Sequence, residues 1–258
     1  MIFKKILILA LPILFIQCDK GEEISEAKEV ELEYSTKQNA IIQDYTSTGC
    51  NGCGLWGAPT FNEFIVNHPA VVPIAVHIKY GDPMITDESN DLGNNRIGRK
   101  WTPQIAVGHE QSVVLVSNGI DGAKSKVKMQ AVYDSIVSQE QKVKVAAAYK
   151  ADGNFFTMYY GGEVLKEDGS EYLITSYLMQ NSLAAFQQGG DSLEVHNHFI
   201  RTSTDGAFGK SFTGKMEFKK VIELDPSWDW SKVYSLAIIW KKNGSNYEFV
   251  NAIEGTKL

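Results

Sequence analysis

The stretch NAIIQDYTSTGCNGCGLWGAP, residues 39–59, decides the fold because it runs from an apolar segment into two cysteines separated by two residues. Its first part, residues 39–45, is rich in apolar side chains and typical of a strand, and the Thr/Ser/Gly run at 46–49 predicts a loop. Residues 60–67 carry apolar side chains at helical spacing, and VVPIAVHI at 71–78 is typical of a buried strand. This order predicts two parallel strands joined by a crossover helix.

Cys50 and Cys53 form a Cys-x-x-Cys pair, a spacing that suits zinc binding or thiol-disulfide exchange. A structural zinc site normally takes four ligands, and no second Cys-x-x-Cys or nearby His-x-x-x-His completes one. The redox interpretation is therefore favoured, and no cofactor is expected. A cysteine at a helix N-terminus faces unpaired backbone N–H groups and the positive end of the helix dipole, which favour the thiolate. We expect Cys50 to attack and the more buried Cys53 to resolve the mixed disulfide.

Three positions near this pair resemble the thioredoxin fold. Asp44 lies six residues before Cys50, where thioredoxins keep a buried carboxylate. Pro59 resembles the proline that kinks the active-site helix of that fold. Thr102-Pro103, which leads into an apolar run at 104–107, resembles the cis-proline that faces the disulfide.

The resemblance implies roles for these residues. Asp44 would accept or relay the proton that Cys53 must lose, because a carboxylate removed from water tends to have a raised pKa. Pro103 has no N–H, and together with Thr102 and Trp101 it would lie beside an extended substrate segment. The resemblance therefore implies a catalytic set of the two cysteines, Asp44 and Pro103.

A structural disulfide within the same scaffold is the alternative for the cysteine pair. Exported proteins hold many such bonds, and fold does not determine function. The motif also departs from the usual one, with Gly49 in place of tryptophan and Asn51-Gly52 in place of Gly-Pro. Asp44 could equally be a satisfied or solvated carboxylate at a strand end.

The N-terminus predicts export. Two lysines precede an apolar run of eleven residues at 6–16, which is short of the roughly 20 residues that a spanning helix needs. The run stops just before Cys18, and this placement resembles a bacterial lipoprotein signal. We therefore expect a signal peptide at 1–17, lipidation of Cys18 with attachment to a membrane, and an acidic tether at 18–33.

The remaining sequence divides into two predicted domains. The first, 34–140, is an α/β thioredoxin-like domain that a helix at 123–139 closes. The polar segment DESNDLGNN at 87–95 is predicted to be a loop, because it lacks the terminal Glu of an EF-hand. In the second, 141–258, polar and apolar residues alternate between frequent Gly-containing turns, which predicts an all-β, immunoglobulin-like sandwich.

Charge and histidine content limit the partners. The net charge is −6, with 25 basic and 31 acidic residues and no basic cluster, so no nucleic-acid partner is expected. His196 and His198 would share one face of a strand and are weak metal candidates. Because two ligands do not make a site, no metal is expected.

Nearly the whole mature chain resembles a Bacteroidota outer-membrane lipoprotein family named for a 28-kilodalton outer-membrane protein. The resemblance rests on the lipoprotein signal, the Cys-x-x-Cys half and the string HNHFIR at 196–201 in the β-rich half. It implies a protein anchored to the outer membrane by lipid, with an envelope or surface protein as partner. Exposure at the cell surface is left open. Two functions then compete: thiol-disulfide exchange, and surface binding or adhesion with a structural cysteine pair.

Overall fold

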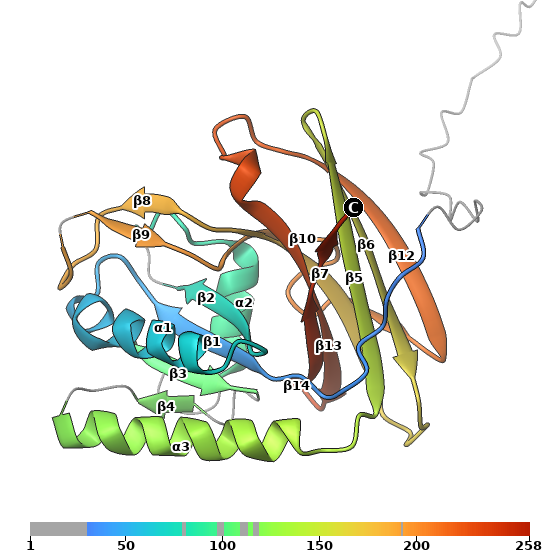
Figure 1. The fold of residues 1–258 in the computed structure, drawn as a ribbon, viewed down its shortest axis with the longest axis horizontal. Helices are drawn as coiled ribbons and strands as arrows, with labels where there is room; N and C mark the ends of the chain where they lie inside the picture. The colour runs from blue at the N-terminus through green and yellow to red at the C-terminus, as the bar shows by residue number, and fades with distance from the viewer. Residues whose placement is uncertain (1–29, 79–80, 97–100, 109–112, 116–118, 192) are drawn as a thin grey trace, which may run out of the picture. The chain divides into compact units, whose positions relative to one another are not determined.

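The computed structural model describes residues 30–258 except 79–80, 97–100, 109–112, 116–118 and 192 (Figure 1). The predicted signal peptide, Cys18 and the tether as far as residue 29 lie outside the described residues. Residues 32–258 form one compact unit. Among the described residues, no helix combines the length and the apolar character needed to cross a bilayer.

The N-terminal half of this unit is an α/β layer. Strands β1 and β2 are parallel and joined by α1, which confirms the predicted crossover. Strand β3 runs antiparallel to β1, and β4 runs antiparallel to β3, so the order is β2-β1-β3-β4. The elements are β1 (Ile41–Thr46), the π-helical turn η1 (Cys53–Gly57), α1 (Ala58–Asn67), β2 (Val72–His77), α2 (Asp87–Asn95), β3 (Gln104–Val107), β4 (Val113–Leu115) and α3 (Gly119–Val137).

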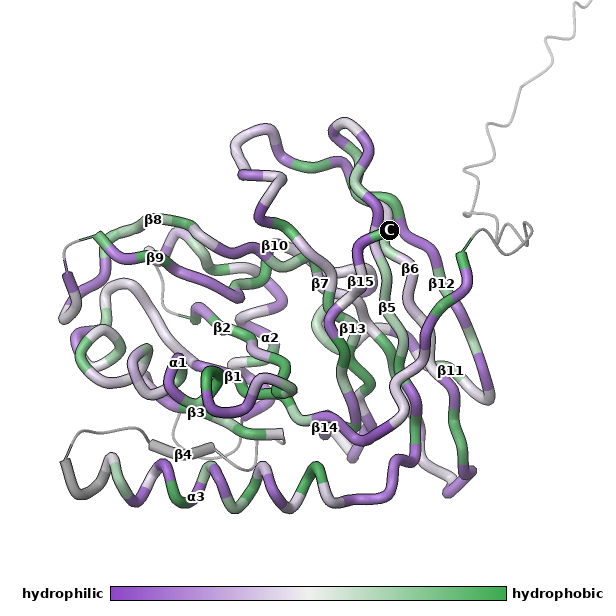
Figure 2. Tube along the Cα trace, viewed as in Figure 1, coloured by the Kyte–Doolittle hydropathy of each residue, from purple (hydrophilic) through white to green (hydrophobic). Residues whose placement is uncertain are grey.

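Helices α1 and α3 lie side by side on one face of this sheet. Lys126 of α3 pairs with Glu63 of α1, and Gln130 contacts His68 just after α1. Helix α1 turns Phe61 and Phe64 into the core, where apolar burial holds it against the strands. Along α3, hydrophilic and hydrophobic residues alternate, as expected for a helix with one exposed face (Figure 2).

The loop predicted at 87–95 is wrong, because this segment forms helix α2. Thr86 caps the helix by accepting a hydrogen bond from the Ser89 backbone, and the Ser89 side chain accepts one from Thr86 N. Leu92 provides a fully buried apolar contact. A capping box and one buried leucine therefore stabilise a helix in a segment whose composition is polar.

The C-terminal half contains two facing sheets. The smaller has the order β12-β6-β5-β15, and it packs on β7, β13 and β14 through a shared apolar core. These strands pair in antiparallel fashion, as predicted from the alternation of polar and apolar residues, except that β15 runs parallel to β5. The elements are β5 (Val143–Asp152), β6 (Phe155–Val164), β7 (Tyr172–Gln180), β8 (Leu183–Ala185), β9 (Glu194–His196), β10 (Phe199–Ser203), β11 (Lys210–Phe212), β12 (Lys215–Glu223), the 3₁₀ turn η3 (Trp230–Lys232), β13 (Val233–Asn243), β14 (Asn246–Glu254) and β15 (Thr256–Lys257).

One sheet runs through both halves. Its order is β14-β13-β7-β10-β2-β1-β3-β4, and β10 joins β2 in parallel where Phe199 lies opposite Ala75. The backbone N–H of Ala75 donates to His198 O at 2.7 Å. The predicted boundary near residue 140 thus falls shortly after the end of α3 but does not separate two sheets. The physical reason is that β2 would otherwise leave an unpaired edge, which β10 covers.

Candidate functional site

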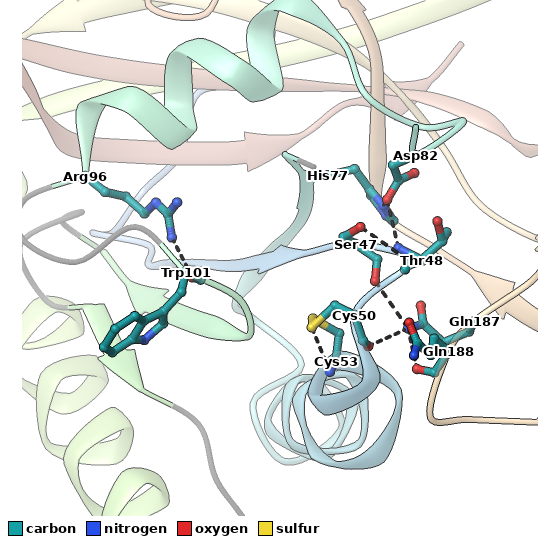
Figure 3. The surroundings of a disulfide bond; sticks show 11 residues. Ser47, Thr48, Cys50, Cys53, His77, Asp82, Arg96, Trp101, Gln187 and Gln188 are labelled. Atoms are coloured by element: carbon teal, nitrogen blue, oxygen red, sulfur yellow. Dashed lines mark hydrogen bonds and ion pairs between the residues drawn. A yellow bond between two sulfur atoms is a disulfide. The ribbon is translucent and has the colours of Figure 1, made fainter. Parts of the chain in front are cut away.

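Cys50 and Cys53 form a disulfide where the loop after β1 turns into the helical segment η1–α1 (Figure 3). The Cys53 backbone N–H donates to Cys50 O at 3.1 Å and lies 3.2 Å from Cys50 Sγ. Cys50 is 8% exposed and Cys53 is fully buried. Both residues are therefore buried, and Cys50 is the more exposed of the two.

The loop before β3 packs directly on the start of this helical segment. The peptide bond between Thr102 and Pro103 is cis. A Cβ atom placed on Gly52 would lie 3.0 Å from Pro103 Cδ, and one placed on Gly57 would lie 2.7 Å from Pro103 Cβ. The proline ring therefore needs glycine at both positions to approach the backbone beside the disulfide.

The two residues before Pro103 lie at the rim of this arrangement. Trp101 has an exposed side chain, and its carbonyl oxygen accepts a hydrogen bond from Arg96 Nη1 at 3.2 Å. Arg96 also stacks on Tyr45 of β1 and donates to Gln104. Thr102 is partly buried. Pro103 itself contacts the helical segment at Gly52 and Gly57, and the substrate-binding role of Trp101 and Thr102 stays a prediction.

Asp44 lies in the middle of β1, opposite Ala75 of β2 and Ile105 of β3. It shares its sheet face with Thr46 and with His77, the residue opposite Thr46. The side chain is almost completely buried, and among the described residues Asp44 Oδ1 has no hydrogen-bond partner. Burial raises the pKa of this carboxyl to about 7. A carboxyl with that pKa can both accept and return a proton near neutral pH.

A histidine–aspartate pair that sequence reasoning missed holds the loop before Cys50. His77 Nδ1 lies 2.8 Å from Asp82 Oδ2, and the same carboxylate accepts the backbone N–H groups of Thr48 at 2.8 Å and Met84 at 2.9 Å. Burial acts to raise the pKa of Asp82, but hydrogen bonds from His77 and the two N–H groups outweigh it and keep the pKa below its usual value. The only sequence signal was a histidine at a strand end followed by a Gly-Asp turn.

A hairpin from the C-terminal half lies beside the loop that carries the disulfide and contacts its backbone through Gln187 and Gln188 (Figure 3). We call it the cap hairpin; it consists of β8, β9 and the described residues of the loop between them, 186–191 and 193. The Gln188 backbone N–H donates to Thr48 O at 2.8 Å, and Gln187 Nε2 donates to Ser47 O at 3.3 Å and to Cys50 O at 3.2 Å. The sequence signalled only a turn at its two glycines, because the contact joins residues far apart in the chain.

Glycines make the closest approach between the cap hairpin and the cysteine loop. A Cβ atom on Gly54 would lie 2.5 Å from Gly190 N, and one on Gly189 would lie 2.0 Å from Asn51 O. Gly189 also has a φ of +86°, which side chains disfavour. The tip of the cap hairpin is therefore fitted backbone to backbone on the start of the helical segment.

The predicted metal candidates do not share one strand. His196 ends β9 and its ring packs edge-on against His77, with ring centroids 5.7 Å apart. His198 lies after β9 in a left-handed conformation, and its Nδ1 contacts Tyr234 Oη at 3.0 Å. Burial lowers the pKa of both, that of His198 to about 4. Among the described residues, no group of three or more His, Cys, Asp or Glu side chains could hold a metal ion.

Comparison with solved structures shows a similar fold. A solved structure, HBP35 of Porphyromonas gingivalis, is similar over 86% of this chain and 76% of that chain, with a TM-score of 0.66 and 19% identity. A domain of the outer membrane lipoprotein Omp28 from Porphyromonas gingivalis matches 46% of this chain and 90% of its own length, with a TM-score of 0.35 and 14% identity. A DUF3823 family protein from Bacteroides ovatus matches 45% of this chain and 55% of its own length, with a TM-score of 0.30 and 14% identity.

No protein-family model matches the sequence, and a comparison with curated proteins finds no match either. At 19% identity the likeness to HBP35 concerns the fold and not the chemistry. Over most of its length, this chain is similar in fold to HBP35 of Porphyromonas gingivalis.

Proposed function

We propose that this protein is a lipid-anchored protein of the outer membrane whose thioredoxin-like N-terminal half exchanges disulfides through Cys50 and Cys53. The observation that carries the proposal is the packing of Pro103 on Gly52 and Gly57, directly beside a disulfide at the start of a helix. The order β2-β1-β3-β4 with α1 between the parallel strands supports it further. An immunoglobulin-like sandwich would complete the chain.

The proposed exchange begins with a partner thiolate. It attacks Cys50 Sγ, the Cys50–Cys53 bond breaks, and Cys53 leaves as a thiolate that takes up a proton. Asp44, with its pKa near 7, is the buried group suited to supply that proton. A second partner thiolate then displaces Cys50, so that the partner gains a disulfide and the pair gains two electrons and two protons. Reduction of a partner disulfide is the same sequence in reverse.

Trapping of the mixed disulfide tests the proposal. Cys53→Ser leaves Cys50 without a resolving thiol, so envelope proteins should accumulate on Cys50 as adducts visible on non-reducing gels. Cys50→Ser is the matched control and should trap none, because the remaining Cys53 is buried. Equal trapping by both variants, or none by either, would count against the exchange function.

A second function is favoured by the low exposure of the two cysteines and by the contacts of the cap hairpin with their loop. In this alternative the bond is structural, and the protein binds or adheres to a surface partner. The reduction potential of the pair separates the two functions. A value below about −300 mV indicates an inert bond, and a value in the range of thioredoxins and oxidases indicates exchange.

The anchoring part of the proposal rests on the sequence before the described residues. Cys18 would carry the acyl chains, an envelope or surface protein would be the partner, and no nucleic acid would bind. Because each buried CH₂ of an acyl chain contributes about 0.8 kcal/mol, several chains hold a protein stably on a bilayer. Cys18→Ala should therefore move the protein to the aqueous phase in detergent partitioning or leave its signal uncut. Wild-type protein with an unmodified Cys18, identified by mass, would remove the lipid anchor.

A further inference from the structure

A break in the strand register sets Arg201 apart from the rest of β10. In the β7–β10 ladder, Ile200 lies opposite Met179 and Thr202 lies opposite Leu178, so Arg201 is an extra residue between two register pairs. A β-bulge of this kind redirects the side chain of the inserted residue. Arg201 is also the only arginine in the sequence between positions 141 and 258. The bulge therefore places the one guanidinium of the C-terminal half outside the regular alternation of its strand.

Two aromatic rings and one side-chain amide hold this guanidinium. Its Cζ atom lies 4.7 Å from the ring centroid of Phe199 and 4.9 Å from that of Trp228. Its Nε donates a hydrogen bond to Gln180 Oε1 at 2.7 Å. Phe199 and Gln180 are both buried, so the contacts fix the guanidinium in position without help from a ligand.

Hydrogen bonds also fix the loop that carries Trp228. Asp225 O accepts the backbone N–H of Trp228 at 3.0 Å and the indole N–H of Trp230 at 2.9 Å. The Asp225 carboxylate accepts the backbone N–H of Ser227 at 2.8 Å and its hydroxyl at 2.6 Å. This carboxylate is therefore engaged by its own turn rather than by the guanidinium of Arg201.

The two Nη groups of Arg201 are left without a protein partner. Among the described residues, Arg201 forms no ion pair and donates no hydrogen bond except the one from Nε. Neither Nη atom is among the buried side-chain atoms that lack a partner, so solvent reaches both of them. Burial of the rest of the group lowers the pKa of Arg201, and the charge of Asp225 opposes this only in part. A partly desolvated cation without a counter-charge favours binding of an anion.

We propose that Arg201 anchors an anion-binding site that takes a ligand through a carboxylate or phosphate group. The two Nη groups present parallel N–H donors in one plane, which match the paired oxygens of such a group. Phe199 and Trp228 form the walls that hold the fork in place. The inference does not rest on the disulfide, and it gives the β-rich half a binding role of its own.

Titration with inorganic phosphate and with acetate tests the site in the intact protein. Each anion replaces chloride at constant ionic strength, and NMR follows the Arg201 Nε–H and Trp228 indole N–H signals. We expect both signals to shift and saturate with at least one of the two anions. A response to phosphate alone would support the site and assign it to phosphate-bearing ligands, and a response to acetate alone would assign it to carboxylates. No saturable shift with either anion would overturn the site.

Arg201→Lys and Lys210→Gln form a matched pair for this titration, read from the Trp228 signal. Arg201→Lys keeps the charge but removes the planar fork, so the affinity for the anion should fall by about tenfold or more. Lys210→Gln removes an exposed cation that also lies over a ring, 4.2 Å from the centroid of Phe218, but that offers no fork. Its affinity should stay within about twofold of wild type. An equal affinity in wild type and Arg201→Lys, or an equal loss in both variants, would overturn the site.

Phenylglyoxal provides a second measurement in the wild-type protein if Arg201→Lys does not fold. This reagent modifies accessible guanidinium groups, and the mass of the peptide that contains Arg201 reports how far the modification has gone. A bound anion occupies the Nη groups, so phosphate or acetate should slow the modification relative to chloride at the same ionic strength. A rate that neither anion changes would contradict the proposal.

Discussion

The core around β1 and the core between the two sheets of the sandwich differ in how their buried polar side chains are hydrogen-bonded. Of the five buried side-chain atoms that have no hydrogen-bond partner among the described residues, three belong to ionisable residues: Asp44, His77 and His196. All three lie in β1, β2 and β9, around the cysteine loop and the cap hairpin. The other two belong to the neutral side chains of Ser235 and Trp240 in β13.

The core between the sheets is instead built almost entirely from aliphatic and aromatic side chains. Its two buried tyrosines place their hydroxyls on carboxylates, Tyr160 on Asp205 at 2.9 Å and Tyr172 on Asp168 at 3.1 Å. Buried polar atoms without a hydrogen-bond partner destabilise a fold and are tolerated where they serve chemistry, whereas a well-packed apolar core supplies stability. The difference supports the proposal that the sandwich supplies stability and that the β1 region carries the site.

The largest expected effect lies in the sandwich core. Phe156 of β6 is fully buried and stacks on Tyr149, so Phe156→Ala should lower the free energy of unfolding by about 3–5 kcal/mol, measured by urea denaturation. The neighbouring Phe155, which is 47% exposed, is the control, and Phe155→Ala should cost less than about 1 kcal/mol. If both variants lower the free energy of unfolding equally, burial in the sandwich core does not supply the stability of the fold.

The second prediction concerns the stability that the fold loses when the buried carboxyl of Asp44 ionises. An aspartate carboxyl has an ordinary pKa of 3.8, and burial raises that of Asp44 to about 7. Between these values the folded protein keeps a proton that the unfolded chain has released, so the free energy of unfolding should fall as the pH rises. At about 1.4 kcal/mol per unit of pKa difference, the fall is at most about 4 kcal/mol.

Asp44→Asn should abolish this pH dependence. Relative to wild type, the variant should gain stability in urea denaturation between about pH 4 and about pH 8. Asp91→Asn, which alters an exposed carboxyl of α2, is the control and should keep the wild-type slope. A variant of Asp44 with an unchanged slope would show that this carboxyl is ionised in the fold, and the proton-relay role would then fail.

The smallest expected effect is local to the cysteine loop. Asp82→Asn weakens the bonds to His77 and to Thr48 N, so unfolding should become easier by about 1–3 kcal/mol at neutral pH. Because the pKa of Asp82 is lowered in the fold, this loss should be present above the ordinary pKa and shrink as the pH falls through the folded value. His77→Gln and the double variant complete a double-mutant cycle, and additive changes in the free energy of unfolding would mean that the pair does not act as a unit. Hydrogen exchange at Thr48 N–H should quicken in both variants.

The part of the site that could be predicted is the part with short-range patterns. The order of β1, the cysteine pair, α1 and β2 followed from periodicity over residues 39–78, and Asp44 and Pro103 followed from a family resemblance. Helix α2 was missed because its stability comes from the Thr86 capping box rather than from an apolar stripe. The Gln187 contact with Cys50 joins positions 137 residues apart, and the β10–β2 pairing rests on one register pair, so no local pattern announces either.

The pairing of β10 with β2 has a consequence for recombination. A crossover near residue 140 that exchanged the C-terminal half for one from another protein would remove β10. Strand β2, whose residues are all buried in this fold, would then form an unpaired edge of the sheet. Such an edge templates association with other chains. The cap hairpin would be lost in the same event, since it sits between β7 and β10. A recombination that keeps this edge covered must therefore supply another strand that pairs with β2 in place of β10.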